Sequence, residues 1–238
     1  MTSNLLTVSV NEISFFITHA AVGAGAPFGV AEDFAKDMMW VSCCGIDPAV
    51  TALSCLEKLD GSPNSGRMSM IEDDTSWTFV GSDGLSAVYA GTALTDFWNL
   101  ESRDGRSLVI RDVDHPLLMA AALAKTENPP SVLEWPNARV TFNDEGEAEI
   151  SAFEAESALA RGPVNIRASN VSKKQDWNVG FILDASYLVC VARQMVEKNI
   201  SVDAAAWAGI VALFRRCLVP SSEQSRMSGA GAGLVDTD

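Results

Sequence analysis

The stretch Ser9-Val10-Asn11-Glu12-Ile13-Ser14-Phe15-Phe16-Ile17 opens the first predicted helix of the chain. A serine followed three residues later by a glutamate is a capping box, in which each side chain accepts a hydrogen bond from the backbone N–H of the other. The apolar residues after it recur at helical spacing. These residues are Ile13, Phe16, Ile17 and Ala20. The pattern predicts a helix from about Val10 to Val22, with Gly23 as its natural stop.

Two more helices are predicted directly after the first. The turn at residues 23–29 contains three glycines and leads into a second helix, which ends at Gly45. Asp47-Pro48 caps a third helix, and Gly61 closes it. The first sixty residues are therefore predicted to form a compact three-helix unit. The loop from Asp60 to Arg67 is rich in Gly, Pro, Ser and Asn, and it marks the boundary of this unit.

Shorter apolar patterns follow the loop and predict a sheet. The expected strands are Ser76–Val80, Leu108–Asp112, a hairpin of Ala138–Phe142 with Ala148–Phe153, and Gly162–Ala168. Leu85–Leu100 fits a helix or a strand, and a helix is expected from Asp114 to about Lys125. Two further helices, Asp184–Lys198 and Asp203–Leu218, precede the last twenty residues, in which Gly and Ala alternate over Gly229–Gly233.

The fold class predicted by this order of elements is α+β. It comprises an N-terminal three-helix unit, central short mixed or antiparallel strands, two C-terminal helices and a Gly/Ala-rich tail. We expect one domain over residues 1–238, with a helical subunit at 1–60 and an α+β body at 68–238.

Charge and composition exclude several classes of function. The chain of 238 residues carries a net charge of −14, which opposes binding to nucleic acid and to anionic membranes. Its apolar stretches are shorter than the ~20 residues of a membrane span, and its start does not match a signal peptide. The five cysteines form no C-x-x-C pair. They predict reduced thiols in a bacterial-type cytoplasm, with Cys43, Cys44 and Cys55 as buried apolar residues and no metal site.

Three residues are candidates for proton transfer. Of the two histidines, His19 lies within the first predicted helix and is expected to be a packed or surface residue. His115 lies beside Asp112 and Asp114, whose carboxylates would favour its protonated form, and it is the first candidate. The alternative is that His115 only occupies the start of a helix before Pro116. Glu32 and Glu223 are the other two candidates, each near a predicted anion-binding segment.

The tail supplies most of the candidate ligand-binding residues. Hydroxyl groups and a planar cation suit a carboxylate or a phosphate, and glycines permit close approach of the backbone. The candidates are Gly25, Arg161, Ser222, Ser225, Arg226, Gly229 and Gly231. The alternative is a frayed end without a function.

The chain resembles DUF3726, a group of uncharacterised bacterial proteins. The resemblance rests on four segments: Ser9–Ile13, the run Gly23–Asp33 with Trp40, Arg161-Gly162-Pro163-Val164, and Val219–Arg226 followed by Gly229–Gly233 and Asp236. It implies a shared fold and a shared surface at these segments. It implies no reaction, and no motif identifies a cofactor.

The first sixty residues are also similar to the opening helices of the type-2 malate/L-lactate dehydrogenases, which are NAD-dependent. In that family a G-I-D-S-H-G segment holds a histidine. Here Gly45-Ile46-Asp47 is followed by Pro48-Ala49-Val50, so the histidine is missing. The chain is also too short for a complete member, and hydride transfer is therefore not expected by this route.

Two hypotheses on function follow. In the first, the protein is an enzyme or a binding protein for a small anionic metabolite, in a catabolic pathway, and its site joins the glycine turn, the segment at Arg161 and the tail. In the second, it is a non-catalytic accessory subunit or partner-binding protein that docks through its tail. Its partner is another protein, or the chain forms a homo-oligomer. The paucity of histidine and the lack of a nucleophile motif favour the second hypothesis.

Overall fold

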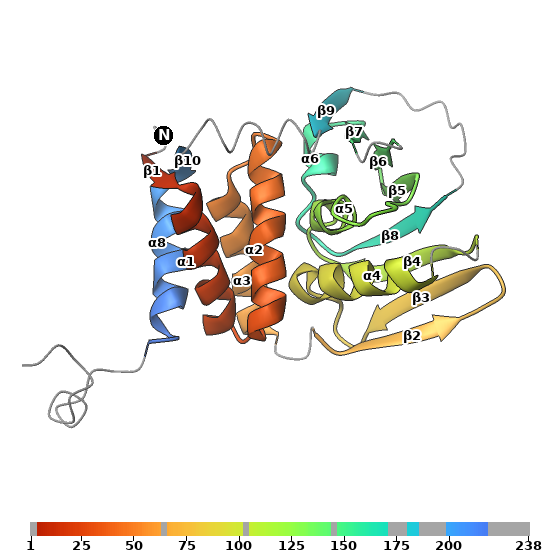
Figure 1. Cartoon of the computed structure of the whole chain (residues 1–238), viewed down its shortest axis with the longest axis horizontal. Coiled ribbons are helices and arrows are strands. Elements are labelled where there is room, and N and C mark those ends of the chain that lie inside the picture. Colours follow the sequence, from red (N-terminus) through yellow and green to blue (C-terminus); the bar gives the residue numbers. More distant parts are fainter. Residues whose placement is uncertain are drawn as a thin grey trace, which may run out of the picture.

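Helices and a large sheet occupy opposite halves of the molecule (Figure 1). The computed structural model describes residues 4–62, 66–101, 105–143, 147–170, 180–185 and 199–218. In one half, helices α1, α2, α3 and α8 stand side by side, and in the other half the strands of the sheet lie against α4 and α5. This arrangement confirms the predicted α+β class.

Local capping sets the starts of the helices in the first half. The helices are α1 (Val10–Gly23), α2 (Phe28–Cys43), α3 (Pro48–Gly61) and α8 (Ala204–Arg215). The capping box of α1 is present, because Glu12 Oε2 accepts a hydrogen bond of 2.8 Å from the backbone N–H of Ser9. Asp47 Oδ1 caps α3 by accepting hydrogen bonds from the two N–H groups that follow Pro48. The predicted three-helix unit is confirmed, and α8 packs on it as a fourth helix.

The start of the chain meets residues 199–218. Strand β1 (Leu5–Ser9) pairs antiparallel with β10 (Asn199–Asp203) in a sheet of two strands. Helix α8 crosses α1 closely at Gly23, where an added Cβ would lie 2.1 Å from the carbonyl oxygen of Leu213. Gly23 therefore ends its helix, as predicted, and also permits the close approach of α8. Neither short strand was predicted, because each gains its partner about 190 residues away in the chain.

The large sheet has eight strands in the order β2-β3-β4-β8-β5-β6-β7-β9. Its strands are β2 (Met68–Glu72), β3 (Ser76–Gly81), β4 (Ser107–Val113), β5 (Val132–Trp135), β6 (Ala138–Phe142), β7 (Ala148–Ala152), β8 (Val164–Ser169) and β9 (Phe181–Ala185). Only β3 and β4 pair in parallel among these described strands. The predicted strands at β3, β4 and β8 and the β6–β7 hairpin are confirmed.

Helices α4 (Ala87–Glu101) and α5 (Leu117–Leu123) join the two halves. Every residue of α5 is buried, and α5 packs against both α2 and α4. The segment Leu85–Leu100, which fitted a helix or a strand, forms most of α4. A short helix α6 (Ala155–Ala158) follows β7. None of the helices in the described ranges is long and apolar enough to cross a membrane.

One predicted helix begins incorrectly. Asp184 was expected to start a helix to Lys198, but it belongs to β9, which pairs with β7 at the edge of the sheet. The apolar residues Phe181–Leu183 therefore complete a ladder rather than lead into a helix. Residues 186–198 lie outside the described part of the chain. The predicted final helix is confirmed as α8, with Asp203 as its N-cap.

Candidate functional site

The turn between β4 and α5 has an unusual backbone. His115 has a φ of 45° and Asp112 has a φ of 52°, values at which a side chain is strained. A non-glycine residue in such a conformation costs about 1–3 kcal/mol, and such residues cluster at functional sites. The two strained residues flank Asp114. This turn is therefore a candidate functional site.

Asp114 is fully buried in this turn and organises its surroundings. Its Oδ1 accepts a hydrogen bond of 2.7 Å from the backbone N–H of Ala87, and Lys58 Nζ lies 3.3 Å from Oδ2. Asp114 was expected to open α5. It instead satisfies the start of α4, while Pro116 is the N-cap residue of α5. The contact with Lys58 is an ion pair without hydrogen-bond geometry, because Oδ2 has no hydrogen-bond partner.

The ring of His115 is held between two polar groups. Its Nε2 and Ser54 Oγ form a hydrogen bond of 2.9 Å between the turn and α3. Its Nδ1 lies 3.4 Å from Asp114 Oδ1, within ion-pair distance, but makes no hydrogen bond. The predicted proximity of His115 to Asp114 is thus present. The predicted approach of Asp112 to His115 is not seen. The side chain of Asp112 is exposed, and its backbone N–H donates a hydrogen bond to Asn165 Oδ1.

A cavity of about 50 Å³ lies beside His115. It is lined by Ile46, Thr51, His115, Leu117, Leu118, Leu159, Ala160 and Arg161. Arg161 is exposed, and its guanidinium makes no hydrogen bond or ion pair with any described residue. The structure therefore brings together two residues predicted separately from the sequence, His115 and Arg161. Ser54 was missed, since nothing in the pattern of α3 distinguishes it from a surface serine.

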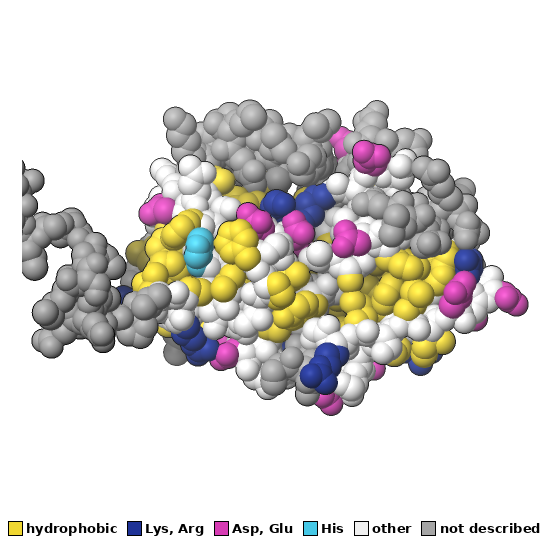
Figure 2. All heavy atoms as spheres, turned by 60° about the horizontal axis from the view of Figure 1, so that its bottom comes forward, with side chains coloured by type: hydrophobic (Ala, Val, Ile, Leu, Met, Phe, Trp, Pro, Cys, Tyr) yellow, Lys and Arg dark blue, Asp and Glu magenta, His cyan; other side chains and the backbone are white. Residues whose placement is uncertain are grey.

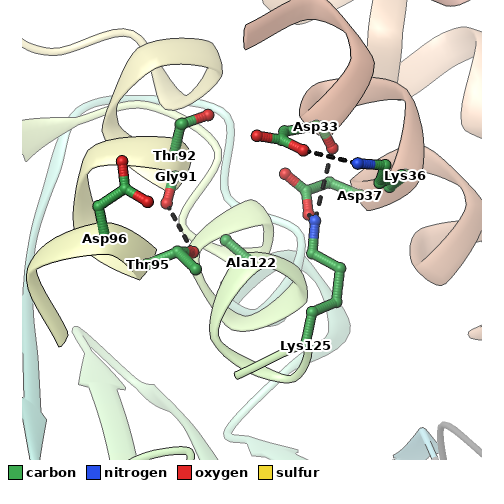
Figure 3. Close-up of a pocket in the computed structure, with 9 residues that line it drawn as sticks. All are labelled: Asp33, Lys36, Asp37, Gly91, Thr92, Thr95, Asp96, Ala122 and Lys125. Atoms are coloured by element: carbon green, nitrogen blue, oxygen red, sulfur yellow. Dashed lines mark hydrogen bonds and ion pairs between the residues drawn. The ribbon is translucent and has the colours of Figure 1, made fainter. Parts of the chain in front are cut away.

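A second cavity, of about 200 Å³, lies between α2, α4 and α5 (Figure 3). Asp37 of α2 projects into it, and Lys125, just after α5, extends to meet that carboxylate. Lys125 Nζ lies 2.5 Å from Asp37 Oδ1, an ion pair in which the oxygen has no hydrogen bond of good geometry. Lys36 Nζ pairs with Asp33 Oδ1 at 2.9 Å on the same helix.

Asp37 is the buried carboxylate with the clearest electrostatic change in the described chain. Burial raises its pKa to about 6, and the attraction of Lys125 only partly opposes that rise. The sequence contains a pattern that distinguishes Asp37, although Asp37 was not predicted as a site residue. Asp37 lies among Phe34, Met38 and Val41, so an acid occupies the buried stripe of α2.

The cysteines differ in part from the expectation. Burial raises the pKa of Cys44 to about 12 and that of Cys55 well above its ordinary value, with Asp114 adding to the effect at Cys55. Both are buried and free, as expected, and neither is a reactive thiolate at neutral pH. Cys43 is half-buried and disulfide-bonded, which corrects the prediction that it is a reduced, buried residue. A disulfide satisfies the sulfur without full burial.

Two other predicted site residues, Gly25 and Glu32, do not line the His115 cavity. Gly25 is exposed, with a φ of 102°, and its carbonyl oxygen accepts a hydrogen bond of 3.3 Å from Tyr89 of α4. Glu32 is exposed on α2. The tail candidates lie outside the described residues, so the tail hypotheses stay predictions. These candidates are Ser222, Glu223, Ser225, Arg226, Gly229 and Gly231.

His19 lies in a different environment from His115. Its ring stacks on Phe15 at 4.3 Å between centroids and approaches Phe28 and Phe214. Its Nδ1 bonds to the carbonyl oxygen of Phe15 at 2.8 Å. Figure 2 shows hydrophobic side chains gathered around a histidine on this face of the molecule. The prediction of a packed or surface histidine fits these contacts. In the described ranges no group of three His, Cys, Asp or Glu side chains could hold a metal ion.

Comparison with known proteins gives a family match over the first part of the chain and several solved structures with a similar fold. The model of DUF3726, a protein family of unknown function, matches residues 8–76 and confirms the resemblance over that stretch. No curated protein matches the chain in sequence. One similar solved structure is a dehydrogenase from Sinorhizobium meliloti, with a TM-score of 0.57 and 11% identity, covering 89% of this chain and 100% of that one. Another is malate dehydrogenase from Pyrococcus horikoshii OT3, with a TM-score of 0.55 and 10% identity, covering 93% of this chain and 99% of that one. Sulfolactate dehydrogenase from Methanocaldococcus jannaschii is a third, with a TM-score of 0.55 and 8% identity, covering 89% of this chain and 97% of that one.

These likenesses concern the fold alone, and they extend beyond the opening helices to nearly the whole length of those chains. The segment Gly45-Ile46-Asp47 is structural here. Asp47 caps α3 and accepts a hydrogen bond of 2.7 Å from the backbone N–H of Asp203, and Ala49 is fully buried. The segment therefore does not supply the histidine that hydride transfer would require according to that resemblance.

Proposed function

We propose that this protein is an enzyme that binds a small anionic metabolite, a carboxylate of the hydroxy-acid class, in the His115 cavity. The observation that carries the proposal is the position of His115. Its ring is fixed by Ser54 on a strained turn, beside a buried carboxylate and a cavity that an unpaired Arg161 lines. Strain, a buried charge and a free cation at one cavity are the pattern of a functional site.

Arg161 takes the role of the anion-binding residue. A guanidinium offers a planar pair of donors that match a carboxylate, and in this chain those donors have no described partner to displace. The carboxylate would enter a cavity whose other walls are mainly apolar, among them Leu117 and Leu159. A small site of about 50 Å³ favours a ligand of a few non-hydrogen atoms inside, with the charged end at Arg161.

His115 takes the role of proton carrier. Its Nε2 is engaged with Ser54, so Nδ1, which makes no hydrogen bond, is the ring nitrogen left to exchange a proton. Asp114, at 3.4 Å, stabilises the imidazolium that forms when His115 accepts one. The three side chains also resemble a Ser-His-Asp array, but Asp114 does not hydrogen-bond His115. General acid–base catalysis therefore fits better than nucleophilic attack by Ser54.

The substrate class is supported by the fold. Malate dehydrogenase and sulfolactate dehydrogenase, two of the similar structures, are named for small hydroxy acids that carry at least one anionic group. Such compounds present a carboxylate for Arg161 and a hydroxyl group whose proton His115 could accept. The sequence-based expectation of a small anionic metabolite agrees with this class.

Calorimetric titration of the full chain with acetate, lactate and malate tests the proposal. We expect at least one hydroxy acid to bind, and Arg161→Gln to weaken its affinity by about tenfold to a hundredfold, because the charge-assisted pair is lost. Arg161→Lys should recover only part of the loss, since an ammonium lacks the planar pair of donors. Arg167→Gln, which removes an exposed arginine of β8, is the control and should change nothing. Equal affinities of Arg161→Gln and the unmodified chain would contradict the proposal.

A further inference from the structure

The cavity between α2, α4 and α5 is not used by the His115 site and has its own charges. Three carboxylates and two amines line it: Asp33, Asp37, Asp96, Lys36 and Lys125. Each lysine is already paired with a carboxylate of α2, Lys36 with Asp33 and Lys125 with Asp37. Asp96, on the facing side of α4, is exposed and has no partner among the described residues. The cavity therefore has an unpaired negative charge at its rim.

The inner end of the same cavity presents a carboxylate oxygen that no described residue engages. Asp37 is only 4% exposed. Its Oδ1 faces Lys125, and its Oδ2 lies toward Gly91, 3.6 Å from the position that a Cβ would take there. No hydrogen bond to Oδ2 is formed by any residue that the structure describes. Oδ2 is not among the fully buried atoms of the described chain, so the cavity reaches it, and a donor that enters the cavity can bond to it.

Stability does not account for the arrangement. A carboxylate that an ion pair stabilises has a lowered pKa. Burial instead raises the pKa of Asp37, although the positive charge of Lys125 opposes the rise. The ionised pair is thus unfavourable for folding at neutral pH, as is common for buried ion pairs. A buried acid that costs stability and lies in a cleft with a specific charge partner is a candidate for ligand binding.

We propose that this cavity is a second binding site, which takes the protonated amine of a small organic cation. The ammonium donates to Asp37 Oδ2 at the inner end of the cavity, and the rest of the ligand extends along α4 past the hydroxyl group of Thr92 to Asp96 at the rim (Figure 3). A diamine or a guanidino-amine places a positive charge at each end and fits this pair of acids best. A carboxylate ligand is disfavoured, because both lysines are already neutralised.

Substitution of Gly91 is the most specific test of the proposed ammonium position beside Asp37 Oδ2. A Cβ at Gly91 would contact Ala122 Cβ at 3.4 Å and Asp37 Oδ2 and Met119 Cε at 3.6 Å each, which are ordinary contact distances. Alanine also favours a helix more than glycine does. Gly91→Ala is therefore expected to fold with an unchanged or raised Tm, while its methyl group occupies the space in front of Oδ2.

The experiment is a calorimetric titration of the full chain with ethylamine, putrescine and agmatine, with lactate as the anionic reference. We expect putrescine or agmatine to bind, and Gly91→Ala and Asp96→Asn each to weaken that binding by about tenfold or more. Asp83→Asn removes an equal charge from an exposed position outside the cavity and should leave the affinity unchanged. The proposal is overturned if none of the three amines binds, or if Gly91→Ala and Asp96→Asn bind the amine as tightly as the unmodified chain does. Lactate bound at the proposed hydroxy-acid site would leave this result unaffected, since that site uses other residues.

Discussion

Asp114→Ala is expected to lower the free energy of unfolding by about 2–3 kcal/mol, because it removes a buried carboxylate that accepts a hydrogen bond from a buried backbone N–H and pairs with the half-exposed Lys58. Asp114 is fully buried and its carboxylate contacts three groups: the backbone N–H of Ala87 at the start of α4, the ammonium of Lys58 and the ring of His115. The alanine variant leaves that N–H without its acceptor and the ammonium of Lys58 without its counter-charge. Urea denaturation followed by tryptophan fluorescence measures the loss.

Two variants make this prediction specific. Asp114→Asn keeps an oxygen for Ala87 but removes the charge, so its loss of stability should lie between those of the unmodified chain and the alanine variant. Asp112→Asn changes the same charge two residues away, at an exposed position where φ is 52° and where asparagine is well tolerated. It should alter stability by less than about 0.5 kcal/mol. A loss below about 1 kcal/mol for Asp114→Ala would show that the turn is held by other contacts.

Asp37→Asn should stabilise the protein at neutral pH and have little effect in acid. The folded-state pKa of Asp37 is about 6, against an ordinary value of 3.8, so between these pH values the folded chain keeps a proton that the unfolded chain has lost. The contribution of Asp37 to stability therefore falls as the pH rises through this window and is lost above it. The whole shift corresponds to about 3 kcal/mol. Asparagine does not ionise and avoids this loss.

The difference in unfolding free energy between Asp37→Asn and the unmodified chain is the quantity to measure. We expect it to grow in favour of the variant by about 2–3 kcal/mol between about pH 4 and about pH 7.5. Asp83→Asn, at an exposed position, is the matched control, and its difference should stay constant over that range. A difference for Asp37→Asn that does not change with pH would mean that Asp37 titrates as an ordinary surface carboxylate.

Local signals in the sequence were sufficient for the helical half of the fold. The capping box at Ser9 and the Asp47-Pro48 start act within a few residues, and both helices begin where these signals place them. Strands β1 and β10 were missed because their pairing depends on a contact across most of the chain. Asp184 was assigned to a helix because its place at the edge strand β9 is decided by the ladder of β7, which no local pattern encodes.

The site was predictable only residue by residue. His115 and Arg161 were singled out by their chemistry, but their place at one cavity depends on the turn after β4 and the segment before β8. Ser54 and His115, which form a hydrogen bond, are 61 positions apart in the chain. The ion pair of Asp37 and Lys125 spans a still longer separation. The sequence prediction placed the anion site at the tail, whose residues from 219 onward lie outside the described chain. The structure directs the proposal to His115 instead.

The most direct test of the account is a ¹⁵N NMR titration of the histidine rings with the hydroxy acid that binds most tightly. The chain has two histidines, and His19, surrounded by aromatic rings on α1 and α8, serves as the internal control. The account predicts that the ring signals of His115 shift to saturation while those of His19 stay in place, and that Arg161→Gln abolishes the shift. Saturating ligand that leaves the signals of His115 unmoved would contradict it.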